Sequence, residues 1–295
     1  VYVASLPKVG ESVKGHSWRY NVDAGKGPNS AICMARLGAG VAFIGKAGAD
    51  EAGDRAEKWM QESGVDTSGL LRTVEARTGQ GIRIMGPDGK HICICGESCS
   101  WTLTEQEVIR ELDMRAGARF FFTGLEIRLS LALAALKHAK SLGMTTVFNL
   151  SPVPLGESIG DLSFVDYLAV NEVEGAQLAG IGDWHEMSLP EITERIQEKY
   201  RCGCVILTLG ADGCAIRKED KFAHLPGTHV ETIDTIGAGD GFLSAFTVNL
   251  LWGNSVSDAC RWANEYAAYT TTREGSIPSY PMLADIEAYM KERLK

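Results

Sequence analysis

The sequence lacks any long hydrophobic run and any long run of basic residues. No stretch of about 18 apolar residues occurs, so we expect no transmembrane helix. The net charge is −9, from 29 Lys and Arg against 38 Asp and Glu, and an acidic chain of this kind is a poor candidate for binding nucleic acid. An anionic substrate can still bind to backbone amides and helix ends. We therefore expect neither a membrane nor a nucleic acid among the partners.

The sequence also lacks the paired cysteines of a zinc site. Its eight cysteines are Cys33, Cys93, Cys95, Cys99, Cys202, Cys204, Cys214 and Cys260. None of them forms a C-x-x-C pair, so free thiols in a reducing compartment fit better than a metal site. The start of the chain does not resemble a signal peptide, and it is Val1 rather than Met. We expect a cytoplasmic protein.

The dominant pattern is a short apolar run followed by a polar or glycine break and a stretch of helical periodicity. The apolar runs are Val41–Ile44, Phe120–Phe122, Thr145–Phe148, Phe164–Val170 and Val205–Leu209. Their lengths suit buried parallel strands. Amphipathic helices are predicted at Ser130–Leu142 and Leu189–Tyr200. The alternation predicts an α/β fold, with a mostly parallel central sheet and helices on both of its faces.

Two segments, Glu11–Val22 and Arg77–Cys95, depart from this pattern and predict a small β-sheet lid. Gly81–Met85 and His91–Cys95 alternate like strands and flank a turn sequence that contains Pro87-Asp88-Gly89. An ordinary surface hairpin is the alternative interpretation. We predict a lid made of residues 1–22 and 77–97, and an α/β core made of residues 23–76 and 98–295.

The most distinctive segment for chemistry is Asp234-Thr-Ile-Gly-Ala-Gly-Asp240, followed by a predicted helix at Gly241–Leu251. The amides of Gly237, Ala238 and Gly239 would point outward at the start of this helix, where small residues allow a phosphate to come close. Asp240 could simply cap the helix. A carboxylate beside an anion-binding turn is also where a kinase needs a base for the attacking hydroxyl.

This segment resembles the signature of the PfkB carbohydrate kinases, the ribokinase-like family. Further segments match that family in the same order along nearly the whole chain. They are Leu6–Glu11, Ala24–Asn29, Ala35–Gly38, Phe43–Gly53, Asn171–Glu174, Thr208–Gly213 and Arg273–Ser279. Within the family, Lys26 and the Leu125-Glu126 pair resemble the ribokinase branch most closely.

The resemblance implies a role for each matching residue. Asp240 is implied as the general base, and Gly237, Ala238 and Gly239 as the anion hole. The implied sugar contacts are Gly25, Lys26, Asn29 and Glu126, together with Asp240. The implied nucleotide contacts are Asn171, Thr208, Gly210, Gly239 and Asn264. Glu174 is implied to hold Mg²⁺ through water, and Asp234, Ile236, Arg273, Gly275 and Ser279 to hold K⁺.

Each of these residues also has a purely structural interpretation. Asn29 could cap a helix, Glu126 could be a surface acid, and Asp234 could fix a turn. Asn171 and Glu174 could be solvated residues at a helix start. Three positions depart from the family pattern: Ala24 replaces a glycine, Ile236 replaces a threonine, and the first-strand aspartate of the sugar site is expected just before Val1.

Other functions remain open at this point. Gly40–Lys46 fits the P-loop spacing, but Ala47 replaces the Ser or Thr that would reach Mg²⁺, and the residues between are strand-like. A kinase for 2-keto-3-deoxygluconate, fructose or a nucleoside would share the same motifs. A catalytically silent sugar- or nucleotide-binding relative is the alternative from another class.

We therefore predict an ATP-dependent kinase that phosphorylates a primary sugar hydroxyl, with D-ribose converted to D-ribose 5-phosphate as the leading reaction. The resemblance implies Mg²⁺ and an activating K⁺. It also implies a homodimer formed through the lid. Ile82, Ile84, Ile92 and Ile94 could face the partner subunit, and they could equally face the core of their own chain.

Overall fold

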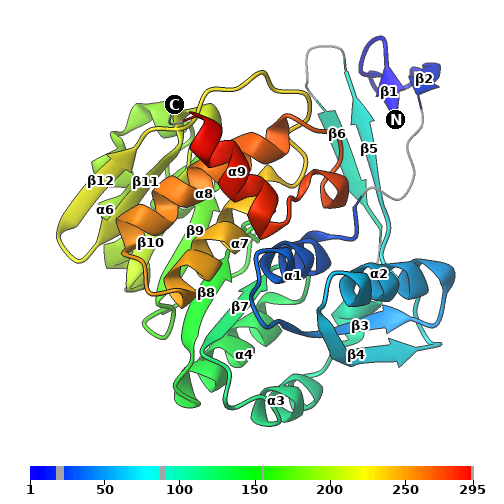
Figure 1. The fold of residues 1–295 in the computed structure, drawn as a ribbon, viewed down its shortest axis with the longest axis horizontal. Helices are drawn as coiled ribbons and strands as arrows, with labels where there is room; N and C mark the ends of the chain where they lie inside the picture. The colour runs from blue at the N-terminus through cyan, green and yellow to red at the C-terminus, as the bar shows by residue number, and fades with distance from the viewer. Residues whose placement is uncertain (18–22, 87–90, 97, 155, 294–295) are drawn as a thin grey trace.

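The computed structural model describes residues 1–17, 23–86, 91–96, 98–154 and 156–293. Its main sheet has six strands in the order β12-β11-β10-β9-β8-β7 (Figure 1). These strands are β7 (Phe120–Gly124), β8 (Thr145–Asn149), β9 (Tyr167–Asn171), β10 (Cys204–Thr208), β11 (Cys214–Lys218) and β12 (Lys221–Leu225). The first four run parallel, and β11 and β12 extend the sheet in antiparallel fashion. The carboxyl ends of the four parallel strands therefore meet at one edge.

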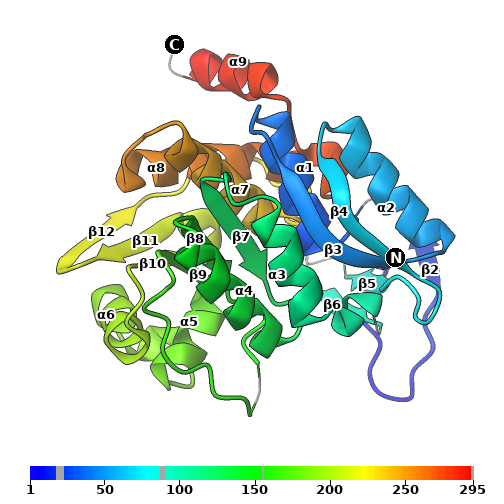
Figure 2. The ribbon, with the colours of Figure 1, turned by 90° about the horizontal axis from the view of Figure 1, so that it is seen from below.

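Helices cover both faces of this sheet (Figure 2). One face carries α7 (Ala238–Leu251) and α8 (Val256–Thr271), with α9 (Leu283–Arg293) outside α8. The other carries α4 (Leu129–Ser141), α5 (Glu172–Ala179) and α6 (Leu189–Tyr200). Both faces of the sheet are apolar and are covered, because successive side chains of a strand point to opposite faces. On β10, Cys204 and Ile206 pack on the α7 side, and Val205 and Leu207 pack on the α6 side. No helix in the described ranges is long and apolar enough to cross a bilayer.

The N-terminal part of the core contributes a separate pair of strands. Here β3 (Ala42–Gly48) pairs in parallel with β4 (Asp66–Thr73). The surrounding helices are α1 (Lys26–Arg36), α2 (Glu51–Glu62) and α3 (Glu105–Asp113). Because α1 packs on α7, the glycine-rich turn before α1 lies near the start of α7. The segment Gly40–Lys46 runs into β3, so it does not form a phosphate-binding loop.

A four-stranded sheet stands apart from the core, with the order β2-β1-β5-β6 (Figure 1). Its strands are β1 (Tyr2–Val3), β2 (Gly15–Ser17), β5 (Gly81–Met85) and β6 (His91–Cys95). The hairpin of β5 and β6 has the predicted bounds, with Gly81 opposite Cys95 and Met85 opposite His91. Residues 87–90 of the predicted turn lie outside the described residues. The domain boundaries stay a prediction.

Three predicted elements differ from the structure by three residues or more at one end, and the helix predicted at Ser130–Leu142 and the other strands predicted for the main sheet differ by one or two. The strand predicted at Val41–Ile44 extends to Gly48, and the one predicted at Phe164–Val170 begins only at Tyr167. Before Tyr167, Asp166 turns inward and accepts hydrogen bonds from Thr146. The helix predicted from Gly241 begins at Ala238 instead. Glycines disfavour a helix in isolation, but here the first turn packs against α1 and α8.

Candidate active site

The predicted site residues gather at the carboxyl edge of the main sheet, around the start of α7. They line part of one cavity of about 1690 Å³, larger than a typical small-molecule site and roomy enough for two substrates. The predicted residues that line it are Gly25, Lys26, Asn29, Glu126, Asn171, Glu174, Thr208, Asp234, Ile236, Gly237, Gly239, Asp240 and Gly275. Five others lie outside its lining: Gly210, Ala238, Asn264, Arg273 and Ser279. The cavity also extends between β3 and β7.

The start of α7 supplies backbone donors. Gly237 is the residue before the helix and has φ +75°, a conformation that favours glycine. The N–H of Ala238 donates to the carbonyl of Thr235 at 3.2 Å, so this amide is occupied, contrary to the expectation that all three would point outward. Gly237 and Gly239 line the cavity, and the first amides of a helix have no partner within it. These two residues can therefore offer N–H groups and a positive helix end to an anion.

Asp240 lies in the first turn of α7 and is buried. Its Oδ2 accepts a hydrogen bond of 3.4 Å from Nδ2 of Asn29 on α1. The pKa of Asp240 is raised to about 7, mainly by burial. The carboxylates of Glu126 and Asp23 also raise it, and the ammonium group of Lys26 lowers it. A carboxylate with a pKa near neutrality is suited to accept a proton from a hydroxyl.

The glycine-rich turn before α1 and the start of that helix bring the ammonium group of Lys26 and the side-chain amide of Asn29 close to Asp240. Gly25 has φ +91°, a conformation that strains other residues, and a Cβ there would lie 3.1 Å from Oε2 of Glu126. The same Oε2 accepts from the N–H of Gly27 at 3.3 Å. Nζ of Lys26 donates to Oγ of Ser151 at 2.7 Å and to its carbonyl at 3.1 Å. The loop after β8 thus orients the ammonium group of Lys26.

The residues predicted for the nucleotide side lie at the ends of β9 and β10. Asn171 and Glu174 form a capping box at the start of α5, with bonds of 2.8 and 3.0 Å between side chain and backbone. Oγ1 of Thr208 donates to the carbonyl of Val170 at 3.4 Å. The amide of Asn264 donates to the carbonyls of Leu225 and Pro226 at the end of β12, a structural contact. Gly210 opens a short 3₁₀ turn with φ +56°.

The predicted cation loop centres on Asp234, which is buried. Its Oδ1 accepts from the N–H of Ile236 at 2.9 Å, and its Oδ2 from the N–H of Gly275 at 3.0 Å. The hydroxyl of Ser279 donates to the carbonyl of Ser276 at 2.7 Å. The guanidinium of Arg273 stacks 3.8 Å from the ring centroid of Tyr269. These contacts bring the loops before α7 and after α8 together.

Sequence reasoning missed four residues that shape the site. Asp23 binds Asn29 and Ser276, and Tyr280 donates from its hydroxyl to the carbonyl of Gly237 at 3.0 Å. Ser151 holds Lys26. Asp23 had a signal in the sequence, as a carboxylate directly before a glycine-rich turn, and Ser276 lies within the matched segment Arg273–Ser279. Ser151 and Tyr280 lie outside the matched segments, far along the chain from the residues that they contact.

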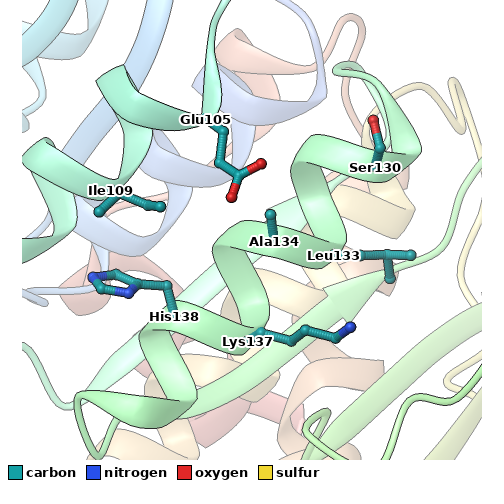
Figure 3. Close-up of a pocket in the computed structure, with 7 residues that line it drawn as sticks. All are labelled: Glu105, Ile109, Ser130, Leu133, Ala134, Lys137 and His138. Carbon is teal, nitrogen blue, oxygen red and sulfur yellow. The ribbon is translucent and has the colours of Figure 1, made fainter.

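A second hollow, of about 590 Å³, lies between α3 and α4 (Figure 3). Its lining residues are Glu105, Ile109, Ser130, Leu133, Ala134, Lys137 and His138, none of which was predicted for the site. Two of its polar groups have partners: Nζ of Lys137 lies 5.1 Å from the ring centroid of Phe164, and Nε2 of His138 lies 2.6 Å from Oδ1 of Asp113. The predicted site residues that line a cavity all belong to the larger one.

Comparisons with known proteins identify a family and similar relatives. Residues 2–283 match the model of the pfkB family carbohydrate kinases. The chain is 30% identical to a ribokinase of Staphylococcus aureus over 264 residues, which cover 89% of this chain and 86% of that protein. It is also 30% identical to fructokinase-1 of Oryza sativa over 290 residues, which cover 89% of this chain and 86% of that protein.

A solved structure shows the same fold. The crystal structure of a ribokinase from Thermotoga maritima superimposes with a TM-score of 0.85 at 25% sequence identity. The match covers 98% of this chain and 94% of that one. The matched region includes both the six-stranded core and the separate four-stranded sheet.

Proposed function

This chain belongs to the pfkB family of carbohydrate kinases, and from that premise we propose that it transfers the γ-phosphoryl group of ATP to the primary hydroxyl of D-ribose. The observation that carries the proposal is the position of Asp240. Its buried carboxylate lies one residue after Gly239 at the start of α7, within a hydrogen bond of Asn29. A base and an anion-binding turn are thus held side by side on one rigid helix.

In the proposed step, Asp240 accepts the proton as the sugar oxygen attacks the γ-phosphorus. A new O–P bond forms, the bond from the γ-phosphorus to the bridging oxygen breaks, and ADP leaves with the electron pair. The amides of Gly237 and Gly239 and the positive end of α7 stabilise the charge on the transferring group. Lys26, Asn29 and the Glu126 carboxylate orient the sugar hydroxyls.

D-Ribose is the leading substrate because ribokinases are among the most similar relatives, and because Lys26 and Glu126, which resemble the ribokinase branch, both line the cavity. Fructose is the second candidate, since a fructokinase is equally similar at 30% identity. Both sugars offer a primary hydroxyl and neighbouring secondary hydroxyls, so the phosphoryl transfer itself would be the same. The choice between ribose and fructose would depend on contacts to the rest of the sugar.

Residues in the structure fit the two metal ions that the resemblance implies. The capping box of α5 uses Oε2 of Glu174 and leaves Oε1 for a water molecule on Mg²⁺. Asp234 is a buried carboxylate whose donors are two backbone amides, which leaves its charge for a monovalent cation. We propose that Mg²⁺ neutralises ATP near Asn171 and Glu174. We propose K⁺ beside Asp234, where it would strengthen the positive field at the start of α7.

We further propose that the four-stranded sheet is a lid and that two copies of the chain pair through it. On its β5–β6 hairpin, Ile82 and Ile94 lie opposite each other and are 56% and 58% exposed. An exposed apolar pair on a sheet is typical of a surface that is covered by a partner.

The test is an ATP-consumption assay with ribose, fructose, 2-deoxyribose, 2-keto-3-deoxygluconate and nucleosides, with Mg²⁺ and with either K⁺ or Na⁺. We expect the highest kcat/KM with ribose and a higher rate in K⁺. Asp240→Asn is expected to lose about 10³-fold in kcat while the KM values change less than about threefold. The exposed Asp220→Asn is the matched control and keeps the wild-type rate.

Two outcomes would contradict the proposal. If Asp240→Asn keeps more than about a tenth of the wild-type kcat, the base assignment is wrong. If the wild type binds ATP but turns over none of the acceptors, the chain is a silent relative of the kinases.

A further inference from the structure

Asp23 is a carboxylate of the active-site cavity that no motif of the chain singled out. It lies two residues before Gly25, is exposed, and lines the same cavity as Lys26, Asn29 and Asp240. It contributes to the environment of Asp240: after burial and the charge of Glu126, its carboxylate also raises the pKa of Asp240. The carboxylate of Asp23 is therefore close to the reacting end of the site.

Three neutral donors fix the Asp23 carboxylate in place. Its Oδ1 accepts from the N–H of Gly25 at 2.7 Å and from Nδ2 of Asn29 at 3.1 Å, and its Oδ2 accepts from Oγ of Ser276 at 3.0 Å. Neutral donors orient a carboxylate without cancelling its charge. A carboxylate has about four lone-pair positions, so these bonds leave room for a further donor.

The amide of Asn29 links Asp23 to the catalytic carboxylate. Its Nδ2 lies 3.1 Å from Oδ1 of Asp23 and 3.4 Å from Oδ2 of Asp240. One nitrogen atom thus lies between the two carboxylates. A sugar that places its primary hydroxyl on Asp240 has Asp23 within reach of another hydroxyl of the same molecule.

We propose that Asp23 is a specificity-determining residue, which accepts a hydrogen bond from a secondary hydroxyl of the sugar while Asp240 takes the proton of the primary hydroxyl. This inference rests on the proposed function and names a residue that selects among its substrates. A site built to bind a hydroxyl disfavours the analogue that lacks it, because the carboxylate then loses one hydrogen-bond partner.

The competing role for Asp23 is local, because an aspartate can simply shape the turn that leads into α1. An asparagine fills that role equally well, since its Oδ1 can accept from the N–H of Gly25. It lacks the negative charge and the second acceptor oxygen that a sugar hydroxyl would use. Asp23→Asn therefore separates substrate binding from turn formation.

The experiment compares kcat and KM of the wild type, Asp23→Asn and the surface control Asp220→Asn. The acceptors are D-ribose, 2-deoxy-D-ribose and 3-deoxy-D-ribose. We expect Asp23→Asn to lose roughly 10- to 100-fold in kcat/KM for ribose, mainly through KM. With the deoxy sugar that lacks the partner hydroxyl, the variant and the wild type should be equal. The KM for ATP and the melting temperature should stay unchanged, as they should in Asp220→Asn.

Equal losses on all three sugars would overturn the inference, because Asp23 would then act through the shape of the site. Unchanged kinetics with ribose would overturn it as well. Failure of the proposed function looks different, since the wild type itself would then turn over a different acceptor or none. With another acceptor, the deoxy forms of that sugar replace those of ribose. With none, calorimetric titration of the same sugars into the wild type and Asp23→Asn gives the same comparison.

Discussion

The charge of Lys26 acts on the pKa of Asp240 in the candidate site. Burial raises the pKa of Asp240 to about 7, and the ammonium group of Lys26 pulls that pKa down. A base with a pKa near the working pH combines a large ionised fraction with a strong affinity for the proton. The balance between burial and the lysine therefore sets the pH at which the site can act.

The pH profile should report this balance. Because the base must be ionised, kcat/KM for the sugar should fall about tenfold for each pH unit below 7 and level off above it. Lys26→Met removes the charge that lowers the pKa of Asp240, so the midpoint should move to higher pH. Lys26→Arg keeps the charge and should keep the midpoint near that of the wild type. Equal midpoints for Lys26→Met and the wild type would contradict this account.

Asn29 shows how one side chain can organise several others. It is buried on α1, its Oδ1 accepts from the N–H of Ala24, and its Nδ2 donates to both Asp23 and Asp240. Both sides of the amide are thus in use. This side chain holds the glycine-rich turn and Asp240 in one geometry, and the second lone pair of its Oδ1 remains for a ligand.

At the scale of elements, the start of α7 is built by contacts from the C-terminal part of the chain. Tyr280 donates to the carbonyl of Gly237 at 3.0 Å. Nη1 of Arg36 on α1 donates to the carbonyls of Ile277 and Tyr280 at 2.7 and 2.8 Å. Helix α1, the turn before α7 and the loop after α8 therefore form one connected unit around the site.

Two glycine variants separate the contribution of this turn to stability from its contribution to turnover. At Gly237, with φ +75°, a Cβ would lie 2.5 Å from Cβ of Ser276 and from the hydroxyl of Tyr280. Gly237→Ala should therefore lose about 2 kcal/mol or more of unfolding free energy. At Gly239 no atom lies within 4 Å of an added Cβ. Gly239→Ala should keep its stability, or gain up to about 1 kcal/mol.

Turnover should nevertheless fall in Gly239→Ala, because its methyl group would keep a phosphate away from the backbone. We expect kcat/KM for ATP to drop about tenfold or more. Thermal unfolding and ATP kinetics, measured on the same preparations, check both variants. Full activity in Gly239→Ala would show that no phosphate approaches this residue.

At the scale of the whole molecule, the main sheet separates two packed layers and presents its strand ends to the cavity. The layer of α1, α7 and α8 carries the base and the glycine-rich turns, and the layer of α4, α5 and α6 carries the capping box. The four-stranded sheet stands beside the cavity, and its residues Gly81, Ile82 and Arg83 contribute to the lining. A sheet in this place can exclude water from the reaction.

Pairing through that sheet can be tested by changing its exposed apolar face. The double variant Ile82→Lys, Ile94→Lys places charges on two directly opposed residues of the proposed interface. We expect the wild type to elute as a dimer and the double variant as a monomer, measured by size-exclusion chromatography with light scattering. Val74→Lys, at a residue that is 90% exposed outside this sheet, is the control and should stay dimeric. A monomeric wild type at micromolar concentration would contradict the proposed dimer.

The sequence by itself determined the features that depend on local patterns. The alternation of apolar runs and helices predicted the α/β class, and the turn chemistry predicted the two strands of the β5–β6 hairpin with their bounds. The helix at Leu189–Tyr200 has the predicted bounds because its start is signalled locally by Ser188 and Pro190. The motif that ends in Asp240 identified the family because its glycines and its carboxylate are adjacent in the chain.

Only the tertiary structure decided which residues meet. Asp23 and Ser276 are 253 positions apart, and Lys26 and Ser151 are 125 apart, so no local pattern couples them. The pKa of Asp240 depends on the burial of this residue in the first turn of α7, which packs on α1. The start of α7 at Ala238 depends on packing that outweighs the low helix propensity of glycine. Hydrogen bonds, burial and charge act through space, whereas the sequence orders residues only along the chain.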